Sequence, residues 1–268
     1  MDLMRIGYHT SVKNLLGKSD EFFTKYKVFQ VFVGSPRSLQ EPSYTDLSLL
    51  MKRHSDIEVI VHGPYCVNLC KSNAEKCYIS TLSYYIKLAK ALDRIGIKYI
   101  VTHIGGRSDQ QTNKDSAIQI LNFCQKWLMS TSECKIKLCL ENDSGSKKGT
   151  KMGYVPLLAT IVKRMDNPRI RMTFDTEHAY AAGYDLKDKE VLKEFVPYVD
   201  IVHLNSVPNE VEKGGHLDRH STTSFYQSKE DPISVLEVFG KNSILFIMEV
   251  ESEILVKSNY EWLKEFFK

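Results

Sequence analysis

The chain has 268 residues, 43% of them hydrophobic, with a formal net charge of +3 and a pI near 8.4. This length fits one large domain, because α/β barrels of about 250 residues commonly form a single unit. The mildly basic charge permits a polyanionic partner without requiring one. No N-terminal segment has the layout of a signal peptide, and no apolar run approaches the ~20 residues of a membrane span. We therefore expect a soluble, intracellular protein, cytoplasmic or nuclear, without a membrane partner.

Eight short apolar runs recur along the chain. The first two are RIGYH, which ends at His9, and VFQVFVG. The other six end at potential metal ligands, namely His62, His103, Glu141, Asp175, His203 and Glu249. Runs rich in Val, Ile and Leu without alternation are typical of strands that are buried on both faces of a parallel sheet.

Segments with helical periodicity lie between these runs. The clearest covers residues 74–95, where Gly96 closes the helix, and others cover 112–129, VPLLATIVKRM from near Pro156, 187–197 and 256–267. Strand followed by helix, repeated about eight times, predicts a closed (β/α)8 TIM barrel over residues 1–268, with its chemistry at the C-terminal ends of the strands. An open doubly wound sheet is the alternative, but no GxGxxG follows the first strand.

Two loops after strands are expected to carry function. The Gly-rich loop after Glu141 contains Lys147, Lys148 and Lys151, which are either a solvated surface or phosphate contacts. The stretch from Ser206 to about Ser228 has little apolar periodicity, and a loop that long in a compact domain is usually functional or disordered. This second loop contains Asp218, Arg219 and His220.

The six cysteines are expected to stay reduced in an intracellular protein. Cys124 and Cys139 fall within a predicted helix and a predicted strand, so we expect both to be buried small apolar groups. Cys66, Cys70 and Cys77 cluster after His62, but their spacing matches no CxxC pair and does not indicate a zinc site.

Nine nitrogen or oxygen ligands are expected to meet at one barrel mouth. A lone histidine at a strand end is more often structural, so the inference depends on the whole set: His62, His103, Glu141, Asp175, His178, His203, Asp218, His220 and Glu249. Nine are too many for one tetrahedral Zn²⁺, whereas three metal ions that share a carboxylate account for all of them. Imidazole and carboxylate ligands without thiolates favour Zn²⁺, with Mn²⁺ or Fe²⁺ as the alternative at a carboxylate-rich position. Closely spaced metals suit phosphate-ester hydrolysis. His9 is read as a supporting or structural residue.

At these residues the chain resembles endonuclease IV, the family of trinuclear zinc apurinic/apyrimidinic endonucleases. The matching segments are HGPYCVNL, THIGG, LEN with its Gly-rich loop, FDTEHAYAAGYDL, VHLN, DRH and IMEVE, between about Arg5 and Phe266. The resemblance implies three zinc ions per chain, with Mn²⁺ as an alternative at one position, and Glu141 and Glu249 as catalytic carboxylates. It assigns the first zinc to His62 and His103, with Glu141 bridging to the second, which Asp175, His203 and Glu249 complete. The third would be held by His178, Asp218 and His220.

The resemblance also implies a function in base excision repair. The substrate would be double-stranded DNA with abasic sites, cut 5′ to the lesion to leave a 3′-hydroxyl, with 3′-phosphodiesterase activity at the same site of a monomer. Tyr65, Arg219 and Arg37 occupy the positions of side chains that enter the minor groove and help to flip the lesion out. A packing role is the alternative for Tyr65.

The chain departs from the family near the expected lesion pocket. Glu177 stands where a small residue or Cys is usual, Asn205-Ser206 replaces Asn-Asp, and STTSFYQS follows DRH. Two other functions stay open. A sugar isomerase or epimerase would use one divalent metal and a pair of carboxylates, so the third ligand set speaks against it. A barrel that binds damaged DNA without catalysis would not need all nine ligands.

Overall fold

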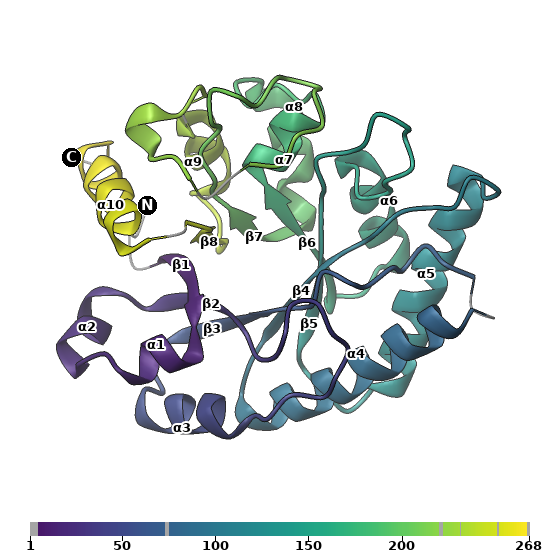
Figure 1. The fold of residues 1–268 in the computed structure, drawn as a ribbon, viewed down its shortest axis with the longest axis horizontal. Coiled ribbons are helices and arrows are strands. Elements are labelled where there is room, and N and C mark those ends of the chain that lie inside the picture. Colours follow the sequence, from purple (N-terminus) through teal and green to yellow (C-terminus); the bar gives the residue numbers. More distant parts are fainter. Residues whose placement is uncertain (1–4, 73–74, 220–221, 231, 251, 267–268) are drawn as a thin grey trace.

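The computed structural model describes residues 5–72, 75–219, 222–230, 232–250 and 252–266. Eight strands follow one another around a closed barrel, every neighbouring pair is parallel, and β1 also pairs with β8 (Figure 1). The predicted (β/α)8 TIM barrel is confirmed. The strands are β1 (Ile6–Ser11), β2 (Val28–Phe32), β3 (Glu58–His62), β4 (Tyr99–His103), β5 (Lys137–Glu141), β6 (Ile170–Asp175), β7 (Val199–His203) and β8 (Leu245–Met248).

Helices alternate with the strands and form an outer ring (Figure 1). The long ones lie close to the predicted ranges, and Gly96 ends its helix in the left-handed conformation (φ 91°). Among the described residues, none of these helices is both long enough and apolar enough to cross a membrane. The helices are α1 (Val12–Leu16), α2 (Asp20–Lys25), α3 (Thr45–Arg53), α4 (Lys76–Ile95), α5 (Asn113–Ser130), α6 (Val155–Met165), α7 (Thr176–Ala181), α8 (Lys189–Phe195), α9 (Ile233–Phe239) and α10 (Glu253–Phe266), with 3-10 turns at Val196–Tyr198 and Phe225–Gln227.

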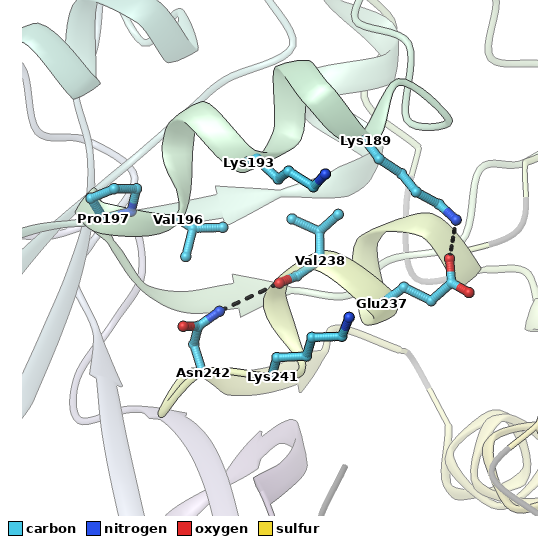
Figure 2. A pocket seen from close by; sticks show the side chains of 8 residues that line it. All are labelled: Lys189, Lys193, Val196, Pro197, Glu237, Val238, Lys241 and Asn242. Atoms are coloured by element: carbon cyan, nitrogen blue, oxygen red, sulfur yellow. Dashed lines mark hydrogen bonds and ion pairs between the residues drawn. The ribbon is translucent and has the colours of Figure 1, made fainter.

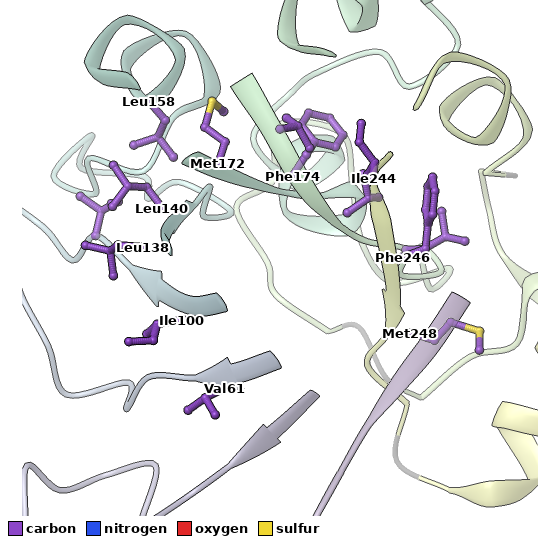
Figure 3. Close-up of a cluster of buried hydrophobic side chains, with 14 of the residues drawn as sticks. Val61, Ile100, Leu138, Leu140, Leu158, Met172, Phe174, Ile244, Phe246 and Met248 are labelled. Atoms are coloured by element: carbon purple, nitrogen blue, oxygen red, sulfur yellow. The ribbon is translucent and has the colours of Figure 1, made fainter. Parts of the chain in front are cut away.

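The core has two layers, because successive strand residues point to opposite sides of the barrel wall. One set packs against the helices and includes Val61, Ile100, Leu138, Phe174 and Phe246 (Figure 3). The alternate set forms a separate cluster that fills the barrel, namely Val28, Ile60, Val101, Cys139, Ile201, Leu245 and Ile247. Burial on both faces explains why the strands read as unbroken apolar runs.

The strand ends place six of the predicted ligands at one end of the barrel. His62, His103, Glu141, Asp175 and His203 are the last residues of β3 to β7, and Glu249 directly follows β8. Parallel pairing sets His103 beside Glu141 and Asp175 beside His203. All eight strands run in the same direction, so these side chains meet at the carboxyl end of the barrel.

All six cysteines are free thiols in the structure. Cys124 and Cys139 are buried, and so is Cys70, while Cys66 and Cys77 are exposed. Burial raises the pKa of the Cys70 and Cys124 thiols to about 12, which leaves both protonated at neutral pH.

Candidate metal centre

Three groups of potential ligands meet at the barrel mouth, and neighbouring groups share a carboxylate. Among the described residues, the first group is His62, His103 and Glu141, the second is Glu141, Asp175, His203 and Glu249, and the third is Asp175, Glu177 and His178. Within each group the ligand atoms lie within 4.8 Å of one another. Seven of the nine predicted ligands are therefore brought together, and Glu177 joins them. Asp218 lies next to the third group, while the predicted ligand His220 lies outside the described residues.

Glu141 is the carboxylate between the first and second groups. Its Oε2 lies 3.1 Å from His62 Nε2 and 3.6 Å from His103 Nδ1. Its other oxygen, Oε1, lies 3.0 Å from His203 Nδ1. One buried side chain thus turns a different oxygen toward each group, which is the geometry a bridging ligand requires.

His203 faces three carboxylates in the second group. Its Nδ1 lies 3.0 Å from Glu141 Oε1, 3.2 Å from Glu249 Oε2 and 3.6 Å from Asp175 Oδ2. The Asn205 amide donates hydrogen bonds to Asp175 Oδ2 (2.7 Å) and Glu249 Oε2 (3.1 Å), so it holds two of these carboxylates in place. His9, read above as a supporting residue, lies behind them with its Nδ1 3.8 Å from Glu249 Oε1.

The third group is carried partly by a loop. His178 lies on α7, and its Nε2 is 3.2 Å from Asp218 Oδ2 in the long loop between β7 and α9. The Glu177 carboxylate is buried beside it, and its Oε1 accepts a hydrogen bond from the Arg219 backbone N–H (3.2 Å). Asp218 is about half exposed (48% of its side chain), whereas His178 is buried.

The donor set fits metal ions, because three histidines have one ring nitrogen already committed to a carbonyl oxygen. His62 Nδ1 lies 2.6 Å from Gly63 O, His178 Nδ1 lies 3.0 Å from Asn142 O, and His203 Nε2 lies 2.8 Å from the Gln30 side-chain oxygen. A carbonyl oxygen only accepts, so each of these nitrogens carries the proton. The other nitrogen of each ring faces a carboxylate at 3.0–3.2 Å, a separation that either a shared proton or a metal ion between the two atoms accounts for. Backing of this kind is typical of metal-binding histidines.

The pKa shifts follow from the same crowding. Burial opposes charge on Glu141, yet His103 and His203 hold the pKa of its carboxyl well below the ordinary value. Burial also opposes protonation of His203, but Glu249 and Glu141 raise its pKa well above the ordinary value. Burial lowers the pKa of His103 to about 4. Without a metal ion, the carboxylates around His203 therefore favour a proton on its ring. His103 stays neutral at neutral pH, which is the form of histidine that binds a metal ion.

The three predicted DNA-contacting residues lie around this cluster. The exposed Tyr65 ring covers the first group, with its centroid 5.6 Å from that of His62 and 5.4 Å from that of His103. The Tyr65 backbone N–H donates to Pro36 O (2.7 Å), which ties its loop to the segment of Arg37. Arg37 and Arg219 are exposed, as are Lys147, Lys148 and Lys151 in the Gly-rich loop.

Sequence reasoning missed several residues of the cluster. Glu177 was noted as a departure from the family but not as a neighbour of the ligands. Asn142 lies one residue after the predicted ligand Glu141, and Asn205 lies two residues after the predicted ligand His203. This proximity in the sequence could have indicated that both amides contact the cluster. Gln30 gave one signal, a polar residue inside the apolar run VFQVFVG, because a buried amide in a barrel strand needs a partner.

A groove of about 670 Å³ lies elsewhere, on the outer ring between α8 and α9. Figure 2 shows the Lys189–Glu237 ion pair at its edge and Val238 between the two helices. None of the predicted ligands lines this groove, so it is separate from the cluster at the barrel mouth.

Comparison with known proteins finds relatives over most of the chain. Residues 24–266 match the family described as xylose isomerase-like TIM barrel. A protein of Mycoplasmopsis pulmonis named probable endonuclease 4 is 28% identical over 240 residues, covering 82% of each chain. Its counterpart in Staphylococcus carnosus is 29% identical over 244 residues, covering 83% of this chain and 79% of its own.

Comparison with solved structures shows that the fold is similar, and nothing beyond the fold. Endonuclease IV from Thermus thermophilus superposes with a TM-score of 0.74 at 22% identity, over 97% of this chain and 99% of its own. A D-tagatose 3-epimerase-like protein superposes with a TM-score of 0.76 at 19% identity, over 97% of each chain. The fold is thus shared by nucleases and sugar epimerases, while the sequence motifs and the sequence relatives are those of endonuclease IV. The chain belongs to the xylose isomerase-like TIM barrels and, among them, to the endonuclease IV family.

Proposed function

We propose that this protein is a DNA-repair endonuclease that depends on bound metal ions. Its reaction is hydrolysis of the phosphodiester 5′ to an abasic site in double-stranded DNA, leaving a 3′-hydroxyl, and the same site removes blocking groups from 3′ ends. The observation that carries the proposal is the position of Glu141, whose two oxygens face His62 and His203 on opposite sides. A sugar isomerase with a single metal ion has no need of a carboxylate shared in this way.

The proposed ligands form three sites for Zn²⁺, with Mn²⁺ as the alternative at one of them. His62 and His103 form the first site and share Glu141 with the second, which Asp175, His203 and Glu249 complete. His178, Asp218 and His220 form the third. Ions bound there would supply Lewis acidity toward phosphate oxygens and lower the pKa of a water to near neutral.

The chain's own residues prepare this chemistry. The carbonyl oxygens behind His62, His178 and His203 fix each ring with a bare nitrogen toward the cluster. Burial of Glu141 and Asp175 keeps water from competing for the ligand oxygens, which strengthens every charge interaction in the site. Glu141 and Glu249 are the proposed catalytic carboxylates, as the resemblance to endonuclease IV implies, and both lie within 3.2 Å of His203 Nδ1.

Lesion recognition is proposed for Tyr65, Arg219 and Arg37. All three are exposed, and Tyr65 lies directly over the first group, where a flipped nucleotide would have to enter. An abasic nucleotide has no stacked base, so it costs least to flip out. The proposal includes a monomer that acts as one domain over residues 1–268 inside the cell.

The experiment that tests this function uses a duplex with one tetrahydrofuran abasic analogue. We expect the zinc-loaded protein to make a single cut 5′ to the lesion and to leave a 3′ end that a DNA polymerase extends, with no cut in the undamaged duplex. Tight binding without incision would support a damaged-DNA-binding protein instead. Epimerisation of a ketose without incision would support the sugar-epimerase alternative.

A further inference from the structure

Gln30 is a buried amide in the barrel wall that contacts both sides of the second group. It lies on β2, is fully buried, and pairs in register with His9 and Ile60. Its side-chain nitrogen lies 2.7 Å from Glu249 Oε1 and 3.1 Å from His9 Nδ1, and its oxygen lies 2.8 Å from His203 Nε2. All three of its hydrogen-bonding partners are thus found within the barrel.

The partners fix which way the amide points. The Glu249 carboxylate only accepts, so the NH₂ group of Gln30 must face it. The amide oxygen must then face His203, and because it only accepts, it keeps the proton of that ring on Nε2. The Nδ1 atom of His203 therefore faces Glu141 and Glu249 and is the nitrogen available to a metal ion.

We propose that Gln30 is a positioning residue for the second metal ion. It acts through two proposed ligands, holding the His203 ring from behind and keeping Glu249 turned so that its other oxygen, Oε2, faces His203 Nδ1 at 3.2 Å. This inference rests on the metal centre of the proposed function. Gln30 itself faces the ligands from behind, so it is not a ligand.

The matched variants are Gln30→Leu and Tyr78→Phe. Leucine has a similar volume and removes all three hydrogen bonds, leaving His203 Nε2–H, Glu249 Oε1 and His9 Nδ1 against an aliphatic side chain. Tyr78 lies on α4 in the outer ring, is buried, and its hydroxyl has no hydrogen-bond partner among the described residues, so phenylalanine there removes a buried polar group far from the proposed ligands.

The experiment measures zinc release to a chromophoric chelator and thermal melting with and without zinc. Loss of a residue that orients metal ligands typically costs 10–100-fold in metal affinity. We expect Gln30→Leu to weaken one zinc site by that factor and to reduce the rise in melting temperature that zinc produces, while Tyr78→Phe binds zinc as the wild type does. Equal zinc affinity in Gln30→Leu and wild type would overturn the inference, as would an equal drop in melting temperature with and without zinc. A wild-type protein that binds no zinc would instead defeat the proposed function.

A second measurement tests the contact between Gln30 and His203 in the wild-type protein, so it does not depend on whether a Gln30 variant folds. In the zinc-loaded wild-type protein with ¹⁵N-labelled histidine, the His203 signal, assigned with His203→Asn, is expected to show a proton on Nε2 that exchanges slowly with water. A proton on Nδ1, or rapid exchange at Nε2, would contradict the contact with Gln30.

Discussion

The candidate metal cluster has a half carried by strands and a half carried by a loop, and the two are built differently. The strand-borne half includes His62, Glu141 and His203, all of them buried, and a further hydrogen bond backs each of the two histidine rings. The loop-borne half depends on Asp218, whose side chain is 48% exposed, in a loop of little regular structure. Strand geometry fixes the first half before any metal binds, whereas the second half depends on how the loop packs.

Hydrogen bonds to neighbouring segments hold the long loop between β7 and α9 in place. The His216 backbone N–H donates to Ala181 O at the end of α7 (2.9 Å), and His216 Nδ1 lies 2.8 Å from Ser144 O in the Gly-rich loop. The Arg219 N–H donates to the buried Glu177 carboxylate (3.2 Å). These contacts join the long loop to the Gly-rich loop after Glu141 and to α7, which directly follows Asp175. We therefore expect the strand half to set whether metal binds at all, and the loop half to set how well the third site is filled.

The largest effect is expected in the strand half, for Glu141→Gln. The amide removes the charge that is shared by the first and second groups, so incision should fall by several orders of magnitude, more than the ~10²–10³-fold that removal of one preorganised donor usually costs. Melting of the metal-loaded protein should stay near wild type, because the side chain keeps its size. The measurement is single-turnover cleavage of abasic duplex. Glu58→Gln, at the opposite end of β3, is the control, and substantial activity in Glu141→Gln would remove Glu141 from the ligands.

A smaller effect is expected in the loop half, for Asp218→Asn. The variant should lose one bound metal ion and about a hundredfold in incision rate, since stabilisation of developing charge is typically worth about 2.7–4 kcal/mol, or 10²–10³-fold. Its melting without metal should be unchanged, because the side chain is half exposed. Glu212→Gln in the same loop is the matched control. Unchanged metal content in Asp218→Asn would mean that the loop half holds no ion.

Tyr65→Ala tests the surface above the strand half. Loss of one base-stacking side chain should weaken binding to abasic DNA by about 1–3 kcal/mol, while metal content and binding to undamaged DNA, which depends mainly on phosphate contacts, change less. Tyr226, which is equally exposed at 53% against 54% for Tyr65 and bonds to Glu265, gives the control Tyr226→Ala. Equal weakening on both DNAs would show that Tyr65 only packs over the histidines.

The smallest effect concerns pH and the protein without metal. The pKa of His103 is lowered from 6.5 to about 4 in the folded protein, so between those values the unfolded chain binds more protons at this residue. The contribution of His103 to stability is therefore present above pH 6.5 and is lost as the pH falls toward 4, by about 1 kcal/mol between pH 6 and pH 5. Urea unfolding of the wild type and of His103→Asn should differ by this amount in pH dependence. Parallel pH profiles of unfolding free energy for the two proteins would contradict the lowered pKa of His103.

The strand half could be predicted from sequence because its signal is local. Each predicted ligand of this half ends an apolar run, and a parallel barrel brings the ends of these runs together independently of the loop conformations. Gln30 could not be placed in the same way, since its contacts with His203 and Glu249 join residues 173 and 219 positions apart and exist only because the barrel closes. Glu177 and Arg219 meet through the packing of an irregular loop, for which the sequence carries no periodicity. The short helix α7, six residues long, is also too brief to show a helical pattern.

The central claim is that the two halves together hold three metal ions, and metal content tests it most directly. Protein purified without chelator should contain between two and three ions per chain, mostly zinc, by elemental analysis. A value near two with an empty third site would agree with a loop half that binds more weakly than the strand half. One ion or fewer per chain would contradict the account.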